Sequence, residues 1–240
     1  MVSLTILAVT PVAQAWDLSD FKEELSSPVT HAQNGLLIGS GLTLSALALR
    51  NPYGENFEER QHKSESLGEY AKYGDYAGQL IPNAAYALYQ GLKGSQGDPD
   101  GYRRALGMIK ATAYAGAVTT ALKYTVRAPR PNDNSVKNSF PSGHSATVFT
   151  FSGYVAAEHG WGWGSAAMAL AAYSGYSRIH DKMHRLHEVI AGATLGLTYG
   201  FGISRLQQEK DNKDSGMIGG FNIAPIFDLN TKGIAIYQEF

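Results

Sequence analysis

The stretch "SFPSGHSATVFTFSGY", residues 139–154, places a Pro-Ser-Gly-His turn directly before an apolar run. Ser142 is a residue type that caps helix N-termini, so the pattern predicts a helix that begins near residue 143. The free backbone N–H groups at a helix start attract anions, and His144 in the first turn could donate a proton to a group attached to such an anion. A cap without chemistry explains the same residues, so the rest of the sequence has to decide.

Composition narrows the function classes. The 240-residue chain carries 20 Lys and Arg against 21 Asp and Glu, which gives a net charge of −1. No broad positive field is present for nucleic acid, and no nucleic acid partner is expected. The chain has no cysteine, which excludes disulfides, thiolate catalysis and thiolate metal sites.

The periodicity of apolar residues predicts an all-α domain. Six segments read as helices: 33–50, 65–93, 100–127, 143–159, 162–180 and 184–208. Pro82 is expected to kink or break the second of them. The cleanest apolar runs, 35–49 and 189–203, are shorter than the roughly 20 residues of a membrane span. We therefore expect a domain that is water-soluble or attached to a membrane surface, with short spans as the alternative.

The two ends of the chain differ from this helical region. An apolar run followed by Ala13-Gln14-Ala15 is typical of a secretory signal, although a basic start is missing and a buried helix or strand is the alternative. At the other end, "FNIAPIFD" and "GIAIYQEF" flank "LNTK" and predict a β-hairpin that covers the helical core, or else serves membrane docking or assembly. The expected organisation is a signal-like segment at 1–15, a helical domain at 16–210, and a linker with a short hairpin at 211–240.

Charged and polar residues on both sides of the "PSGH" turn form a set. Lys123, Arg130 and Arg178 supply three positive charges, and guanidinium forks match phosphate oxygens. The hydroxyl of Ser142 and the N–H groups of Gly143 and His144 add donors. His144 and His184 could face an anion from opposite sides, and Glu188 could fix the tautomer of His184. These residue types fit phosphoryl transfer through a histidine.

The spacing of these residues resembles a known family. The blocks K-x6-R-P, P-S-G-H and S-R-x5-H-x3-D are the signature of the type 2 phosphatidic acid phosphatase (PAP2) superfamily, which also holds bacterial class A acid phosphatases and vanadium haloperoxidases. The chain matches with Lys123, Arg130-Pro131, Pro141-Ser142-Gly143-His144, Ser177-Arg178 and His184, and departs from the pattern with Glu188 in place of Asp. The resemblance covers residues 33–208 and implies a six-helix PAP2-type bundle.

The resemblance also implies roles. His184 would attack phosphorus, Glu188 would orient it, and His144 would protonate the leaving oxygen and then activate water. The residues expected to bind phosphate are Lys123, Arg130, Ser142, Gly143 and Arg178. No metal or other cofactor is expected. The implied activity is hydrolysis of phosphate monoesters, lipid phosphates or envelope phosphoesters, by an exported periplasmic or envelope-associated enzyme with possible membrane-surface contact.

Three alternatives accompany this interpretation. His180, His184 and His187 have a spacing that could bind zinc. The same anion cage could hold vanadate in a haloperoxidase, or the chain could be a non-catalytic member, for which Glu188 is the only evidence. The Tyr- and Ala-rich segment 65–93 could line a channel for a lipid substrate or could equally be core.

Overall fold

The computed structural model describes residues 18–50, 52–64, 66–214, 217–218, 221–228 and 231–237. Within these residues the chain forms helices α2 (Leu18–Thr30), α3 (Ala32–Arg50), α4 (Pro52–Ser64), η1 (Gly68–Tyr70, a 3-10 helix), α5 (Ala71–Gly78), α6 (Ile81–Ser95), α7 (Gly101–Val126), α8 (Gly143–His180) and α9 (Leu186–Asp214). Strands β1 (Met217–Ile218), β2 (Phe221–Asp228) and β3 (Thr231–Tyr237) follow. The signal-like segment expected at 1–15 lies outside the described residues.

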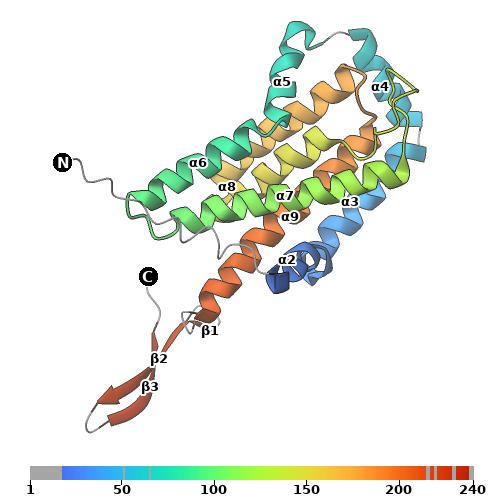
Figure 1. Ribbon diagram of the computed structural model, residues 1–240. Coiled ribbons are helices and arrows are strands. Elements are labelled where there is room, and N and C mark those ends of the chain that lie inside the picture. The colour runs from blue at the N-terminus through green and yellow to red at the C-terminus, as the bar shows by residue number, and fades with distance from the viewer. Residues whose placement is uncertain are drawn as a thin grey trace, which may run out of the picture.

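The bundle is centred on three long helices. Figure 1 shows α6, α7, α8 and α9 running side by side, and α7, α8 and α9 pack against one another. Their facing sides form one buried cluster that consists of Met108, Ala111, Tyr114, Ala115, Tyr154, Val155, Ala167, Tyr199 and Ile203. Because burial of such side chains drives folding, this cluster holds the three helices that carry most of the candidate site.

Helices α8 and α9 approach each other closely because α9 presents glycine at every fourth position. A Cβ atom on Gly192, Gly196 or Gly200 would collide with the backbone carbonyl oxygen of Ser142, Ala146 or Thr150 of the facing chain segment. Residues four apart share one helix face, so the three glycines form a single stripe. This stripe fixes the start of α8 against the start of α9, which brings the "PSGH" turn next to His184 and Glu188.

The number of helices differs from the expected six. The segment expected as one helix at 65–93 is divided into η1, α5 and α6, and α6 begins just before Pro82, a residue favoured in the first helical turn. Helices α2 and α4 were not predicted from the sequence. The expected pair 143–159 and 162–180 corresponds to α8, whose two halves meet at Gly160, a residue with a φ of 76°.

The C-terminal region also differs in detail. Helix α9 extends to Asp214, beyond the expected end at 208, so the helix occupies the start of the expected linker. A two-stranded hairpin was expected at the end of the chain, and the residues described there form three strands in the order β1-β2-β3, with both pairs antiparallel. The register pairs Asn222 with Tyr237 and Asp228 with Thr231.

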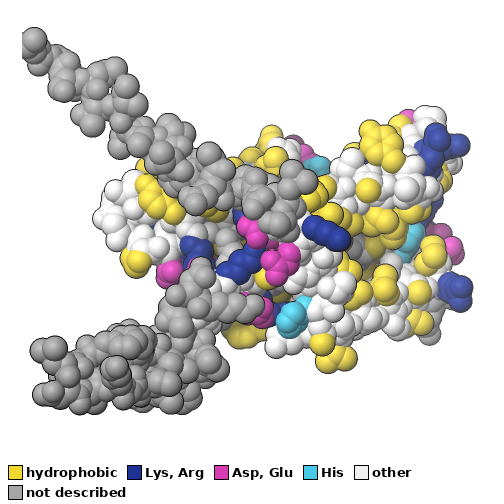
Figure 2. All heavy atoms as spheres, turned by 60° about the horizontal axis from the view of Figure 1, so that its bottom comes forward, with side chains coloured by type: hydrophobic (Ala, Val, Ile, Leu, Met, Phe, Trp, Pro, Cys, Tyr) yellow, Lys and Arg dark blue, Asp and Glu magenta, His cyan; other side chains and the backbone are white. Residues whose placement is uncertain are grey.

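Several helices expose apolar side chains. Helix α3 is long and apolar enough to cross a membrane, and only 17% of its most apolar window is buried. Its Leu36, Leu42 and Leu49 are exposed, as are Leu88 and Leu92 of α6. Figure 2 shows hydrophobic side chains spread over the visible face between smaller groups of charged ones. Water-soluble helices usually turn such residues inward, so these faces indicate an apolar neighbour.

Candidate active site

The "PSGH" turn starts α8 as the sequence predicted. Ser142 is the N-cap, and its buried hydroxyl accepts hydrogen bonds from the backbone N–H and the hydroxyl of Ser145. The Ser142 hydroxyl therefore serves the cap. The backbone N–H of Ser142 donates to the carbonyl oxygen of Glu188 at 3.0 Å. This bond ties the turn that carries His144 to the first turn of α9.

His184 and Glu188 form a buried pair that includes a third residue. His184 lies in the connection between α8 and α9, not on a helix, and its Nδ1 is 3.2 Å from Oε2 of Glu188. The hydroxyl of Ser139 donates to the same oxygen at 2.5 Å and lies 3.3 Å from Nδ1 of His184. The backbone N–H of Arg185 also donates to Oε2. The longer side chain of glutamate thus reaches the imidazole.

The environment sets the protonation states of this pair. Burial alone would raise the pKa of Glu188, but hydrogen bonds from His184, Ser139 and Arg185 outweigh it and hold that pKa below its usual value. Burial lowers the pKa of His184, with Lys123 and Arg130 acting in the same direction and Glu188 opposing them. At neutral pH His184 is therefore a neutral imidazole beside a carboxylate. With Nδ1 donating to that carboxylate, Nε2 keeps its lone pair.

The loop before α8 contacts two of the cations predicted to bind phosphate, Lys123 and Arg130. Nζ of Lys123 donates to the carbonyl oxygen of Asn138 at 2.5 Å, and Nε of Arg130 donates to the side-chain oxygen of the same residue at 2.8 Å. Burial, together with the nearby charge of Arg130, lowers the pKa of Lys123 to about 8. Lys123 is thus a cation held in an environment that favours an anionic partner.

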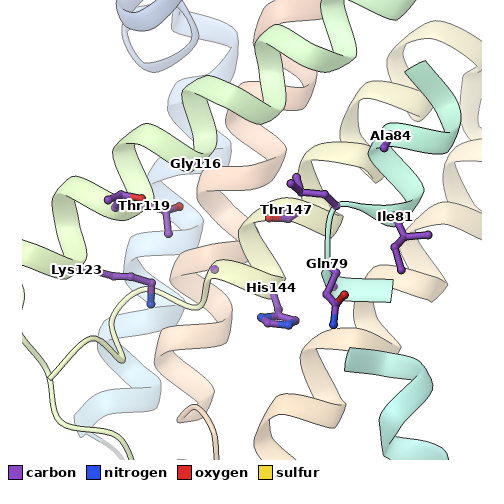
Figure 3. A pocket seen from close by; sticks show the side chains of 12 residues that line it. Gln79, Ile81, Ala84, Gly116, Thr119, Lys123, His144 and Thr147 are labelled. Carbon is purple, nitrogen blue, oxygen red and sulfur yellow. The ribbon is translucent and has the colours of Figure 1, made fainter. Parts of the chain in front are cut away.

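A cavity of about 650 Å³ opens beside this turn. Figure 3 shows Lys123 of α7 and Gln79, which precedes α6, on either side of His144. Gly143 also lines the cavity. The remaining wall comes from Gly78, Leu80, Ile81, Ala84, Gly116, Thr119, Thr120 and Thr147, and is mostly apolar. Lys123 and His144 therefore lie at one edge of a cavity whose remaining wall is mostly apolar.

Arg178 is buried, and carboxylates already hold its guanidinium group. Nη2 contacts Oδ2 of Asp181 at 2.9 Å, and Nη1 forms an ion pair with Oδ1 of Asp75 on α5. The same Asp75 oxygen lies 3.0 Å from Nε2 of His144. Burial, followed by the charge of Arg178, lowers the pKa of His144, and Asp75 opposes this shift. Asp75 therefore joins two residues that the sequence predicted for the site.

Sequence reasoning missed Asp75 and Ser139. Asp75 lies outside the three motif blocks, in a segment that was considered as a channel wall or as core. Ser139 opens the stretch that predicted the site, but a serine in a loop gives no sign of burial. The proposed zinc ligands are not gathered: His180 pairs with Asp181, and His187 stacks on Phe140. No group of three or more His, Asp or Glu side chains in the described part of the chain could hold a metal ion.

Comparisons with known proteins identify a family model and a curated relative that are similar to part of this chain. The sequence profile of the PAP2 superfamily matches residues 104–212. A lipid A 1-phosphatase of Porphyromonas gingivalis is 33% identical over 135 residues, which make up 52% of this chain and 29% of that protein. The chain thus spans less than a third of this curated relative.

A solved structure shows the same fold. The crystal structure of a transmembrane PAP2-type phosphatidylglycerolphosphate phosphatase from Bacillus subtilis superposes with a TM-score of 0.54 at 19% identity, over 78% of this chain and 97% of that one. The resemblance that the three motif blocks indicated is confirmed, because the PAP2 superfamily model matches residues 104–212 of this chain.

Proposed function

We propose that this chain is a phosphatase that hydrolyses phosphate monoesters of lipids and forms a phosphohistidine at His184 during the reaction. One arrangement carries the proposal. The buried Ser139–Glu188–His184 set is near enough to His144 and Lys123 for their charges to affect His184 or be affected by it, and these two residues line a cavity whose remaining wall is mostly apolar. The PAP2 match and the lipid A 1-phosphatase relative support the reaction class.

In the first half-reaction, the Nε2 lone pair of His184 attacks phosphorus and forms the P–N bond. The bond from phosphorus to the ester oxygen breaks, and the leaving oxygen takes its electron pair and a proton from His144. The imidazole of His184 becomes cationic as the P–N bond forms. The carboxylate of Glu188, 3.2 Å from Nδ1, stabilises that charge.

The second half-reaction reverses these roles. His144, now neutral, takes a proton from a water molecule whose oxygen attacks phosphorus. The P–N bond breaks, and its electron pair returns to Nε2 of His184. Inorganic phosphate leaves, and His144 is again protonated for the next cycle. The scheme contains no metal step.

The phosphate would be held by groups at the helix ends. Lys123 and Arg130 share Asn138 as a hydrogen-bond partner and supply two charges. The N–H groups of Gly143 and His144, at the start of α8, supply donors, and the capping hydroxyl of Ser142 keeps that start in place. Arg178 would add a third charge once a phosphate oxygen shares or replaces one of its carboxylate partners.

The lipid part of the proposal rests on apolar surface. Leu80 and Ile81, which are 60% and 56% exposed, stand where the cavity opens between α5 and α6. The exposed leucines of α3 and α6 provide further faces that lipid would cover. A substrate with its phosphate at His144 could lay its chains along this rim. An envelope location is part of this proposal, because a lipid phosphate substrate resides in a membrane.

The test compares two substrates and two variants. Phosphate release is measured in EDTA from a lipid phosphate in mixed micelles and from a soluble aryl phosphate, for the native chain, His184→Ala and His187→Ala. We expect release from both substrates, preference for the lipid, loss only in His184→Ala, and no effect of EDTA. Equal activity of His184→Ala would overturn the histidine mechanism. Preference for the soluble substrate would overturn the lipid assignment, and loss of activity in EDTA would overturn metal independence.

A further inference from the structure

Two glycines of α5 allow this helix to pack closely against α8, which brings Asp75 within reach of α8 side chains. Gly74 and Gly78 lie on either side of Asp75 in the sequence, and both face α8 at close range. A Cβ atom on Gly74 would collide with the side chain of Ser177, and one on Gly78 would collide with the side chains of His144 and Ser174. With these two glycines α5 lies against both ends of α8. The Asp75 carboxylate between them can then contact His144 from one end and Arg178 from the other.

The two histidines of the site have matching arrangements. Glu188 holds Nδ1 of His184 and leaves Nε2 for attack on phosphorus. Asp75 holds Nε2 of His144, and Nδ1 of that ring has no hydrogen-bond partner among the described residues. One nitrogen of each imidazole is therefore paired with a carboxylate, and the other is left for the reaction.

We propose that Asp75 is a positioning residue for His144, whose Nε2 it holds so that Nδ1 gives the proton to the leaving oxygen and takes one back from water. This inference rests on the proposed phosphatase function. It adds a second carboxylate–histidine pair, from an element outside the three motif blocks, to the pair formed by Glu188 and His184.

The charges around His144 show why such a partner is needed. Arg178 at the end of α8 and His184 in the following connection both make protonation of His144 less favourable. Lys123 of α7 lines the same cavity. Asp75 is the acidic group that favours the imidazolium, through its charge and its hydrogen bond. A general acid must hold its proton at the working pH. Asp75 favours this protonated state because its negative charge opposes the effect of the surrounding cations on the pKa of His144.

The test uses leaving groups of different quality. Asp75→Asn keeps the size of the side chain and removes its charge. For a lipid or alkyl phosphate, whose leaving oxygen needs a proton, we expect kcat/KM to fall about 10- to 100-fold, part of what general acid catalysis supplies. For dinitrophenyl phosphate, whose leaving group departs as an anion, we expect a change of less than about 3-fold. Asp75→Glu, which keeps the charge, should retain most of the alkyl phosphate activity.

Asp181→Asn is the matched control. Asp181 contacts Arg178, as Asp75 does, but has no contact with His144. If Asp75 acted through Arg178, both variants would lower kcat/KM by a similar factor for every leaving group, and that result would overturn the proposal. A rise in kcat/KM for Asp75→Asn would show that the carboxylate competes with phosphate, and an unchanged value would show no role. Either would also refute the proposal.

A second readout separates this inference from the proposed function. The pKa of His144, followed by NMR of the labelled imidazole in the full chain, should fall further in Asp75→Asn and stay in place in Asp181→Asn. An unshifted His144 pKa in Asp75→Asn refutes the positioning role, whatever the activity. A native chain without phosphatase activity refutes the proposed function instead.

Discussion

Replacing Glu188 with glutamine isolates the effect of its charge. Oε2 of Glu188 accepts from the Ser139 hydroxyl and the Arg185 N–H and faces Nδ1 of His184, while Oε1 has no hydrogen-bond partner in the described residues. A glutamine with its oxygen at the Oε2 position would keep all three contacts, and its NH₂ group would take the other position. The change therefore removes the charge that faces His184, together with the 3.9 Å ion pair between Oε1 and Nη1 of Arg185, and otherwise alters little geometry.

The distance gives the size of the expected effect. A carboxylate and an imidazolium 3.2 Å apart attract each other by about 5 kcal/mol at an effective dielectric constant of about 20. The attraction is absent while His184 is neutral and grows as the P–N bond forms, so it lowers the barrier rather than the KM. A transition state with half of the charge loses about 2.5 kcal/mol, or about 70-fold in rate, and one with the full charge loses several thousand-fold.

The assay is kcat/KM for a soluble aryl phosphate, with thermal unfolding as the check on folding. We expect Glu188→Gln to lose between about 70-fold and several thousand-fold, mostly in kcat. Glu58→Gln is the control, because Glu58 caps the N–H of Leu186 at 2.7 Å without touching His184. A folded Glu188→Gln within about 3-fold of the native kcat/KM would refute the electrostatic role of Glu188.

Three further predictions follow from the site and the fold. Because the pKa of Lys123 is about 8, kcat/KM should fall above that pH as Lys123 loses its proton, and Lys123→Arg should move the fall to higher pH; an unchanged alkaline limb would contradict this assignment. Gly196→Ala should lower the midpoint of thermal unfolding by several degrees, because the added Cβ would collide with the carbonyl oxygen of Ala146. The control Gly39→Ala, which has open space around it, should not lower the midpoint, and equal midpoints for the two variants would refute the close contact of α8 and α9. Leu80→Asp should lower kcat/KM for a lipid phosphate at least about 10-fold and leave a soluble aryl phosphate within about 3-fold, and parallel losses would contradict a lipid path along this rim.

The sequence predicted the parts of the site that depend on local signals. Ser142 followed by an apolar run predicts a capped helix start, and the structure has that cap. Gly160 separates two helical segments in the sequence, and its positive φ divides α8 at that residue. The pairing of His184 with Glu188 needs only a spacing of four residues, which the short connection before α9 preserves.

Other features depend on tertiary contacts and leave little trace in the sequence. The residues that Asp75 contacts, His144 and Arg178, follow it by 69 and 103 positions in the sequence, and only the fold places its carboxylate between them. Ser139 becomes buried because the loop before α8 folds over the start of α9. Helix α4 has a mostly polar sequence. Its Glu58 and His62 form hydrogen bonds with the backbone of Leu186 and Ile179, more than 100 residues further along the same chain. Such pairings require the three-dimensional structure.

The central claim is that His184 carries the phosphoryl group, and His144→Ala offers a direct measurement. Without the group that activates water, the variant should accept phosphate from dinitrophenyl phosphate, which needs no proton donor, and then stall. We expect a burst of one dinitrophenol per active site and an acid-labile phosphate that mass spectrometry locates on His184. The double variant His144→Ala, His184→Ala should show neither. A native chain that turns over while His144→Ala gives no burst, or a phosphate found on another residue, would contradict the phosphohistidine mechanism.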